Sequence, residues 1–256
     1  MNLLIESIPL SIFNKLSIFS KIFTMNNQYK SPILVAEADQ VERAAFYRKT
    51  YTHVALGVLA FIIMESILLR VDPLVNALLQ LQGYSWLILL GGFMAVTWVA
   101  QNMAYKSASK SSQYAGFLLY VFAQAIIFVP ILYIAIYYSG GVELVKQAAI
   151  VTLAMFVGLT AIVMQTKTDF SVLRGALTIG FFIALGLIIA GTFFGFNLGL
   201  WFSVAMVALA SGSILYSTHQ IKYEYATDQY VPAALSLFAS LMLLFWYVLR
   251  IFMSRD

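Results

Sequence analysis

Cysteine is absent from the 256-residue chain, and histidine occurs only at His53 and His219. Without cysteine there can be no disulfide, iron–sulfur cluster or cysteine-ligated zinc, and two histidines are too few for an all-histidine metal site. We therefore expect no metal and no other cofactor. Charged side chains make up only 10% of the residues, whereas a soluble domain carries about a quarter. The net charge of +4 is modest, so we expect no nucleic-acid partner.

Apolar residues are abundant, at 62% of the chain with a mean hydropathy of +0.88. A helix needs about 20 apolar residues to cross a bilayer, and the charge-poor runs have suitable lengths. The predicted spans are residues 51–69, 84–105, 113–138, 145–165, 171–193, 198–221 and 231–252. The sequence therefore predicts an all-α integral membrane protein with seven transmembrane helices.

The basic residues predict the orientation. Eleven lysines and arginines fall on the N-terminal side of this topology and four on the other side. Basic residues are enriched in cytoplasmic loops. We therefore expect a cytoplasmic N-terminus and an outside C-terminus.

Three regions follow from this topology. Residues 51–252 form a single membrane domain, and residues 25–50 form a cytoplasmic N-terminal region. Residues 1–24 are apolar but contain Glu6, Lys15 and Lys21. Two interpretations of this segment stay open: an interfacial amphipathic helix, or an upstream extension before a true start at Met25.

Glu65 is the one acidic residue inside a predicted span, close to the outer end of the first. An ionisable residue at such depth indicates a functional or paired group. Arg250 lies at a similar depth in the seventh span and is the expected partner in a buried ion pair. Such a pair predicts that Glu65→Gln lowers the thermal stability in detergent.

Serines repeat at helical spacing in the last two spans. Ser213 and Ser217 share one face of the sixth span, and Ser236 and Ser240 share one face of the seventh. Small residues let membrane helices approach closely, and serine hydroxyls hydrogen-bond across the contact. Two interpretations follow: tight packing of the two helices, or a polar seam along which an ion or water moves.

His219 lies about 200° around the helix from Ser217 and outside this seam. It marks the end of the sixth span, where loop groups satisfy it or where it responds to pH.

We expect no enzymatic activity. Ser211 and His219 lie eight residues apart on one helix, about 12 Å, which is too far for direct proton transfer. A metal-dependent hydrolase lacks ligands.

Four stretches together resemble the Bax inhibitor-1 family of transmembrane proteins, in particular its bacterial branch. They are "AFYRKTYTHVALGVLAF", "TKTDFSVLRGAL", "ILYSTHQI" and "YVPAALSLFASLMLLFWYVLRIF". The resemblance covers residues 43–253. It implies seven helices with the last one surrounded by the other six, and a pH-sensitive calcium leak. It also implies a bacterial inner membrane location, and some bacterial relatives bind a membrane AAA protease.

The chain departs from the family at its pH-sensing pair. Where the family has aspartates in "LYDT" and "LYLDI", this sequence has Ser217 in "LYST" and Ser240 in "LFASL". The positions of Glu65 and Arg250 match a family ion pair. Calcium prefers six to eight oxygens, usually including carboxylates, and serine does not titrate near neutral pH. We therefore expect a leak protein whose calcium flux is weak or insensitive to pH. The alternative is a non-conducting regulator that binds another membrane protein, such as a quality-control AAA protease.

Overall fold

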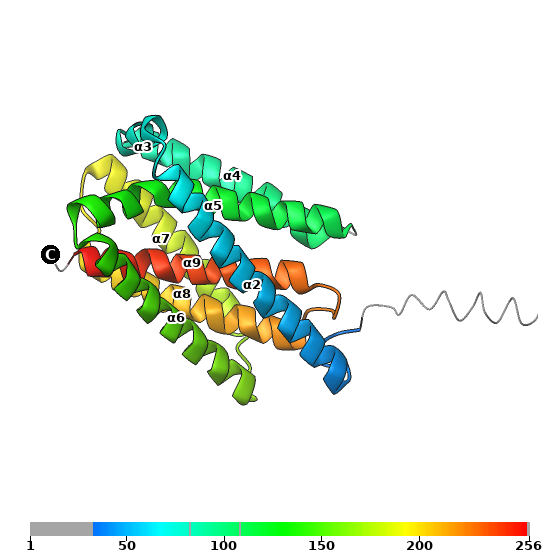
Figure 1. Ribbon diagram of the computed structural model, residues 1–256. Helices are drawn as coiled ribbons and strands as arrows, with labels where there is room; N and C mark the ends of the chain where they lie inside the picture. The colour runs from blue at the N-terminus through cyan, green and yellow to red at the C-terminus, as the bar shows by residue number, and fades with distance from the viewer. Residues whose placement is uncertain (1–32, 82, 108, 255–256) are drawn as a thin grey trace, which may run out of the picture. The chain divides into compact units, whose positions relative to one another are not determined.

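The computed structural model describes residues 33–81, 83–107 and 109–254, which form eight α-helices. The helices are α2 (Gln40–Leu68), α3 (Asp72–Leu79), α4 (Tyr84–Lys106), α5 (Lys110–Tyr138), α6 (Gly141–Gln165), α7 (Leu173–Phe194), α8 (Gly199–Tyr223) and α9 (Tyr230–Met253). All except α3 are long and apolar enough to cross a membrane. This result confirms the predicted all-α class with seven spans (Figure 1).

The start of α2 and the presence of the short helix α3 differ most from the prediction. Helix α2 begins eleven residues before Tyr51, at Gln40, because the side chain of Asp39 accepts a hydrogen bond from the Glu42 backbone N–H at 2.8 Å and caps the helix. The short helix α3 was not predicted. It follows the break at the end of α2 and has Pro73 in its first turn, where proline is tolerated. The interpretations of residues 1–24 fall outside the described residues.

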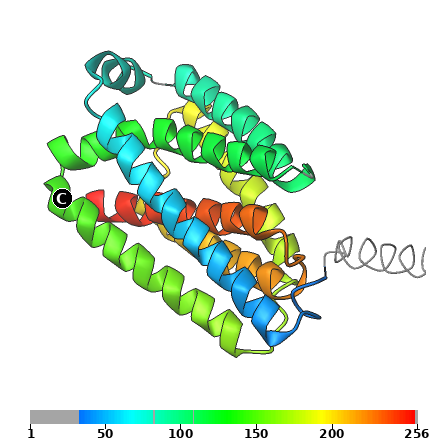
Figure 2. The same cartoon turned by 45° about the vertical axis from the view of Figure 1, so that its right-hand side comes forward.

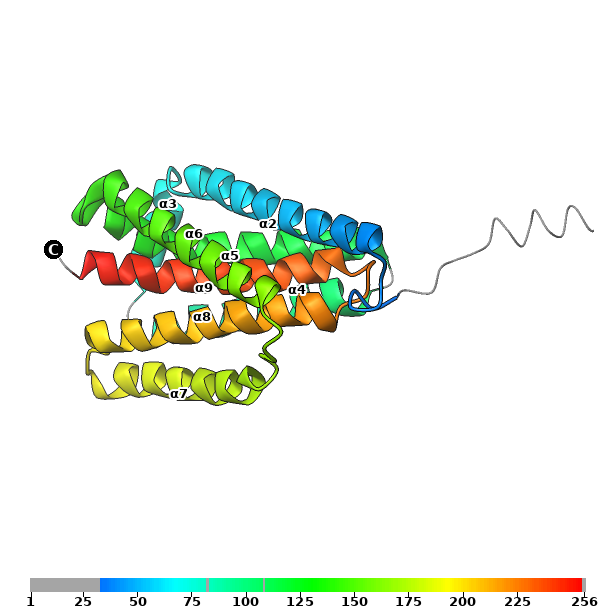
Figure 3. The same ribbon diagram turned by 90° about the horizontal axis from the view of Figure 1, so that it is seen from below.

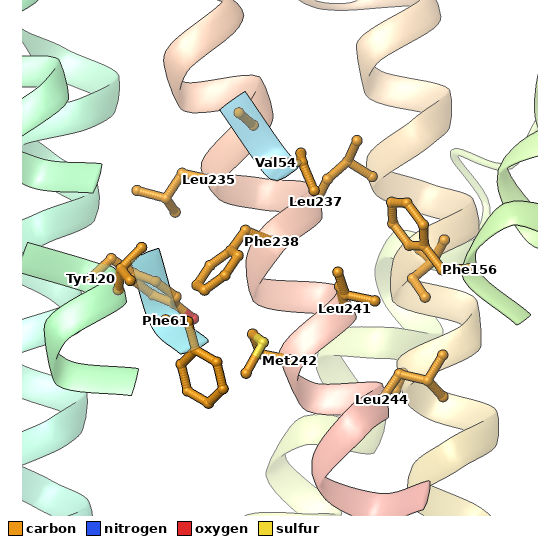
Figure 4. Packing of buried hydrophobic residues seen from close by; sticks show 14 of the residues in the cluster. Val54, Phe61, Tyr120, Phe156, Leu235, Leu237, Phe238, Leu241, Met242 and Leu244 are labelled. Atoms are coloured by element: carbon orange, nitrogen blue, oxygen red, sulfur yellow. The ribbon is translucent and has the colours of Figure 1, made fainter. Parts of the chain in front are cut away.

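Helix α9 lies at the centre of the bundle. It packs against α2, α4, α5, α6 and α8, whereas α7 packs mainly against α8 (Figures 1, 2 and 3). A helix that is apolar on all sides is typical of such a central position. Leu235, Phe238 and Leu244 of α9 are 1% exposed or less, and Figure 4 shows them among side chains of the surrounding helices. The central position expected of the last helix is confirmed, with α7 set outside α8.

Close helix contacts depend on small residues. Gly116 of α5 faces α4, and a Cβ atom there would lie 2.5 Å from the carbonyl oxygen of Ala100. Helices α4 and α5 can therefore approach only because residue 116 is glycine. In the α8–α9 contact, Ala210 and Ala233 are fully buried, which agrees with the small-residue faces predicted for these two helices.

The two ends of the bundle are named here after the predicted topology. The inner end is where α2 begins and where the α4–α5, α6–α7 and α8–α9 connections lie; the outer end is where α9 finishes. At the inner end the Lys222 ammonium donates to carbonyl oxygens of Val163, Met164 and Thr166 at the end of α6. At the outer end Gly195 adopts φ +72° and terminates α7.

Candidate functional site

Four serine hydroxyls meet between α8 and α9. The hydroxyl oxygens of Ser213 and Ser240 are 2.8 Å apart, those of Ser217 and Ser240 are 3.2 Å apart, and Ser236 donates to Ser217 at 2.9 Å. Ser217 and Ser240 are each 4% exposed. We call Ser213, Ser217, Ser236 and Ser240 the serine cluster. The predicted meeting of these residues across the two helices is confirmed.

The hydrogen-bond directions within the serine cluster follow from the number of hydrogens. The Ser240 hydroxyl donates to the backbone carbonyl of Ser236 at 3.1 Å. A serine hydroxyl has one hydrogen, so Ser240 accepts from Ser213 and Ser217. Ser217 in turn accepts from Ser236. The cluster is therefore a connected set in which each hydrogen has one acceptor.

Two tyrosines extend the serine cluster toward the inner end. The side chains of Tyr105, at the end of α4, and Tyr225, just after α8, lie close to the side chain of Ser236. The Tyr225 hydroxyl also donates to the Tyr105 hydroxyl at 3.3 Å. Burial raises the pKa of Tyr225 well above its ordinary value, so this group stays a neutral hydroxyl. Tyr105 is 39% exposed as a whole residue.

A cavity of about 650 Å³ approaches the serine cluster from the outer side. Its deepest polar lining comes from Tyr120, Ser213 and Ser240, each ten residues or about 15 Å from the inner end of its helix. At the outer end Asn197 and Arg250 line it. The cavity is large enough to hold several water molecules and reaches about halfway through the bundle.

The walls of this cavity are mostly apolar, with the rings of Trp86, Phe93 and Trp246 among them. Gln124 of α5 also lines it, one helical turn toward the outer end from Tyr120. Gln124 is 7% exposed, and its side-chain oxygen has no hydrogen-bond partner in the part of the chain that the structure describes. A buried amide oxygen without a hydrogen-bond donor is energetically costly.

The predicted ion pair between Glu65 and Arg250 is wrong. Glu65 is 4% exposed, and neither of its carboxylate oxygens has a hydrogen-bond partner among the described residues. Arg250 is exposed and lines the outer part of the cavity. Similar depth had suggested the pair, but depth does not fix the rotation of either helix about its axis. The positive charge of Arg250 therefore lies at the mouth of the cavity and does not pair with the carboxylate of Glu65.

His219 lies at the inner end among loop groups, as expected, and not in the serine cluster. Its Nε2 atom is 3.2 Å from Oδ1 of Asp169, and Nδ1 is 4.0 Å from Oε1 of Glu224. The backbone amide of Ser171 donates to the Asp169 carboxylate at 2.8 Å and holds its pKa below the ordinary value. Asp169 thus organises the turn before α7. The pH-responsive role of His219 stays a prediction.

No group of three or more metal-ligating side chains occurs among residues 33–81, 83–107 and 109–254. The sequence prediction also missed Tyr120, Gln124 and Tyr225 as parts of the site. Their signal was weak, because Tyr120 and Gln124 are uncharged residues within a long apolar run. The contact between the hydroxyls of Tyr105 and Tyr225 was not predicted either.

Comparison with known proteins identifies the family. The family described as "Inhibitor of apoptosis-promoting Bax1" matches residues 43–256. The chain belongs to the Bax inhibitor-1 family. An uncharacterized protein of Pseudomonas aeruginosa is 31% identical over 223 residues, which cover 85% of this chain and 92% of the relative.

Eukaryotic relatives of the Bax inhibitor-1 family are similar as well. Bax inhibitor 1 of Schizosaccharomyces pombe is 25% identical over 236 residues, or 88% of this chain and 82% of the relative. Protein lifeguard 4 of Mus musculus is 35% identical over 113 residues, or 43% of this chain and 46% of the relative. The resemblance in the sequence motifs is therefore confirmed at the level of the family.

Proposed function

We propose that this Bax inhibitor-1 family member is a membrane leak protein whose conduction path runs through the cavity and the serine cluster. The observation that carries the proposal is their continuity. Ser213 and Ser240 line the deepest part of the cavity and hydrogen-bond to each other at 2.8 Å. An outer vestibule and a polar contact between two central helices are the elements that a gated path requires.

Calcium is expected to pass weakly. Among the residues that the structure describes, no aspartate or glutamate lines the cavity, and the charged residue at its mouth is Arg250. Calcium in proteins is usually bound by carboxylates, and a guanidinium at the mouth repels a divalent cation. Two serine hydroxyls do not titrate near neutral pH, so the path lacks the pH latch that the family resemblance implies.

The test is flux into proteoliposomes, measured separately for calcium, potassium and protons at pH 6 and pH 8. The proposal predicts a leak of a monovalent species that is similar at both pH values and a calcium flux close to that of empty vesicles. Calcium flux with a steep pH response would contradict the interpretation of Ser217 and Ser240. Absence of flux of every ion would contradict the leak function itself.

A gain-of-function variant complements this test. Ser217→Asp combined with Ser240→Asp restores carboxylates at two positions whose oxygens now lie 3.2 Å apart. We expect this double variant to gain calcium flux relative to wild type. Ser211→Asp with Ser240→Asp is the matched control, because Ser211 lies on α8 outside the serine cluster. Equal flux in both variants would mean that the 217–240 contact is not the calcium-selective position.

A second candidate function is a non-conducting regulator that binds another membrane protein, such as a quality-control AAA protease. The arrangement of α7 favours it. Of its 22 residues only Ala184 is buried, and the helix packs mainly against α8. Co-purification of a protease with wild type and its loss on substitution of Phe182, which is 65% exposed on α7, would support this alternative. For either function we propose a bacterial inner-membrane location.

A further inference from the structure

The cavity of about 650 Å³ has its charge at one end and apolar walls further in. Arg250 lines it at the outer end, and Leu90, Phe93 and Leu243 line it deeper in the bundle. Along α9, ten residues or about 15 Å separate Arg250 from Ser240 at the deep end. A cavity of this size is typical of small-molecule sites, which occupy about 300–1,000 Å³.

Arg250 is available to a ligand at the mouth of the cavity. Its side chain is exposed and has no hydrogen bond or ion pair among residues 33–81, 83–107 and 109–254. No other charged residue of the described chain lines the cavity. One guanidinium balances one negative charge, and its planar fork matches a carboxylate through two parallel hydrogen bonds. The mouth therefore favours a ligand with a single carboxylate.

The deep end of the cavity requires no hydrogen bond from a ligand. The Ser213 hydroxyl donates to Ser240 at 2.8 Å, and the Ser240 hydroxyl donates to the backbone carbonyl of Ser236 at 3.1 Å. A serine hydroxyl has one hydrogen, so both hydrogens are used within the protein. An apolar chain end at this level leaves neither of them without an acceptor, and its methylene groups gain dispersion contacts with the walls.

We propose that the cavity binds a long-chain carboxylate, a single-chain amphiphile taken from the leaflet at the outer end. Its carboxylate lies at Arg250, and its hydrocarbon chain extends toward Ser240 between α4, α5 and α9. The cavity has the same polarity as a lipid leaflet, because its charged end lies at the membrane surface and its apolar walls lie below. This binding goes beyond the proposed leak, since it requires no conduction.

The length of the cavity sets the length of the chain. With a C–C bond of about 1.5 Å, an extended hydrocarbon chain advances about 1.3 Å per carbon atom. About twelve carbon atoms therefore span the distance of about 15 Å between the two ends. Dodecanoate is accordingly the probe for the site.

The test is quenching of tryptophan fluorescence by brominated dodecanoate, with the full chain in phosphatidylcholine nanodiscs at pH 8. Trp86 and Trp246 line the cavity. Trp98 and Trp201 are 67% and 83% exposed and are replaced by phenylalanine, so that quenching from the lipid side does not contribute. We expect saturable quenching that unbrominated dodecanoate reverses, with affinities expressed per mole fraction of amphiphile in the bilayer.

Substitution of Arg250 tests the charged end. Arg250→Gln should bind dodecanoate about fivefold more weakly than wild type, the scale of one exposed ion pair. Brominated dodecanol has the same chain without the charge, so it should bind more weakly than dodecanoate to wild type and equally to both proteins. Arg70→Gln is the matched control, because Arg70 is exposed at the outer end and does not line the cavity.

Substitution of Ala239 tests the deep end. Ala239 lines the cavity next to Ser240, so Ala239→Phe adds a ring there and shortens the space for the chain. The chain length with the tightest binding should fall from about twelve to about eight carbon atoms. Ala176→Phe makes the same change at an exposed position of α7 outside the cavity and should leave the preferred length unchanged.

The outcomes separate this site from the leak function. Quenching that does not saturate, or equal affinity of wild type for dodecanoate and dodecanol, would overturn the proposal. Equal affinity of wild type and Arg250→Gln for dodecanoate, or an unchanged preferred length in Ala239→Phe, would overturn it as well. If Ala239→Phe does not fold, Ala239→Leu supplies a smaller step of the same test. A protein that binds dodecanoate in this way but conducts no ion would contradict the leak and support the site.

Discussion

The charge at the cavity mouth sets a measurable barrier to cations. Arg250 lies ten residues beyond Ser240 on α9, about 15 Å along the helix. At an effective dielectric constant of about 20, one unit charge acts on a cation at Ser240 with about 1 kcal/mol. Arg250→Gln should therefore raise the entry of cations from the outer side by at most about fivefold. Arg250→Glu reverses the charge, so the limit becomes about 2 kcal/mol or about thirtyfold.

The assay is the initial rate of proton entry into proteoliposomes at about 10 mM salt, where the screening length is about 30 Å. Raising the salt to about 0.1 M shortens this length to about 10 Å and should remove most of the difference between the variants. Arg70→Gln is the matched control, because Arg70 is exposed at the outer end and does not line the cavity. Equal rates for wild type and Arg250→Glu at low salt would refute the assignment of the cavity as the entrance.

Three further predictions concern stability. Glu65→Gln should leave the melting temperature in detergent unchanged or raise it, because the buried carboxyl group has no partner to lose among the described residues; a clear decrease would indicate a partner for it. Gly116→Ala should lower the free energy of unfolding by about 1–3 kcal/mol through overpacking against α4, whereas Gly92→Ala, which meets open space, should not; equal effects would contradict the close α4–α5 contact. The Ser171 amide lowers the pKa of Asp169 in the folded protein. The ionised carboxylate therefore stabilises the fold at pH values above the unfolded-state pKa of about 4. This stabilisation is lost as the pH falls through the lower pKa of the folded state. Asp169→Asn should therefore flatten the decline of melting temperature below pH 4, and an identical decline in both proteins would refute this role.

The sequence predicts much of this fold because the bilayer imposes simple rules. Span length follows from the thickness of the hydrocarbon layer, so seven helices could be placed from the charge-poor runs. The contact between Ser217 and Ser240 was also predictable, since small polar residues repeat at helical spacing on both sides of one short loop. Spacing alone defines a face of a helix, and the loop makes the two faces neighbours.

The remaining parts of the site depend on helix rotation and on distant segments. Glu65 and Arg250 share a depth but face different surroundings, and periodicity in isolated spans did not reveal this. Gln124 and Tyr120 lie in an uncharged run where nothing distinguishes them from core residues. Tyr225 meets Tyr105, 120 positions earlier in the chain, through a packing arrangement that only the assembled bundle defines.

Cysteine labelling tests the central arrangement most directly, because the chain contains no native cysteine. Single variants Ser213→Cys and Ser217→Cys are reconstituted and treated from the outer side with a membrane-impermeant, negatively charged methanethiosulfonate reagent. The cavity reaches Ser213 but the buried Ser217 lies beyond it, so residue 213 should react and residue 217 should not. Equal reaction at both positions, or reaction at 217 alone, would contradict a vestibule that ends at the serine cluster.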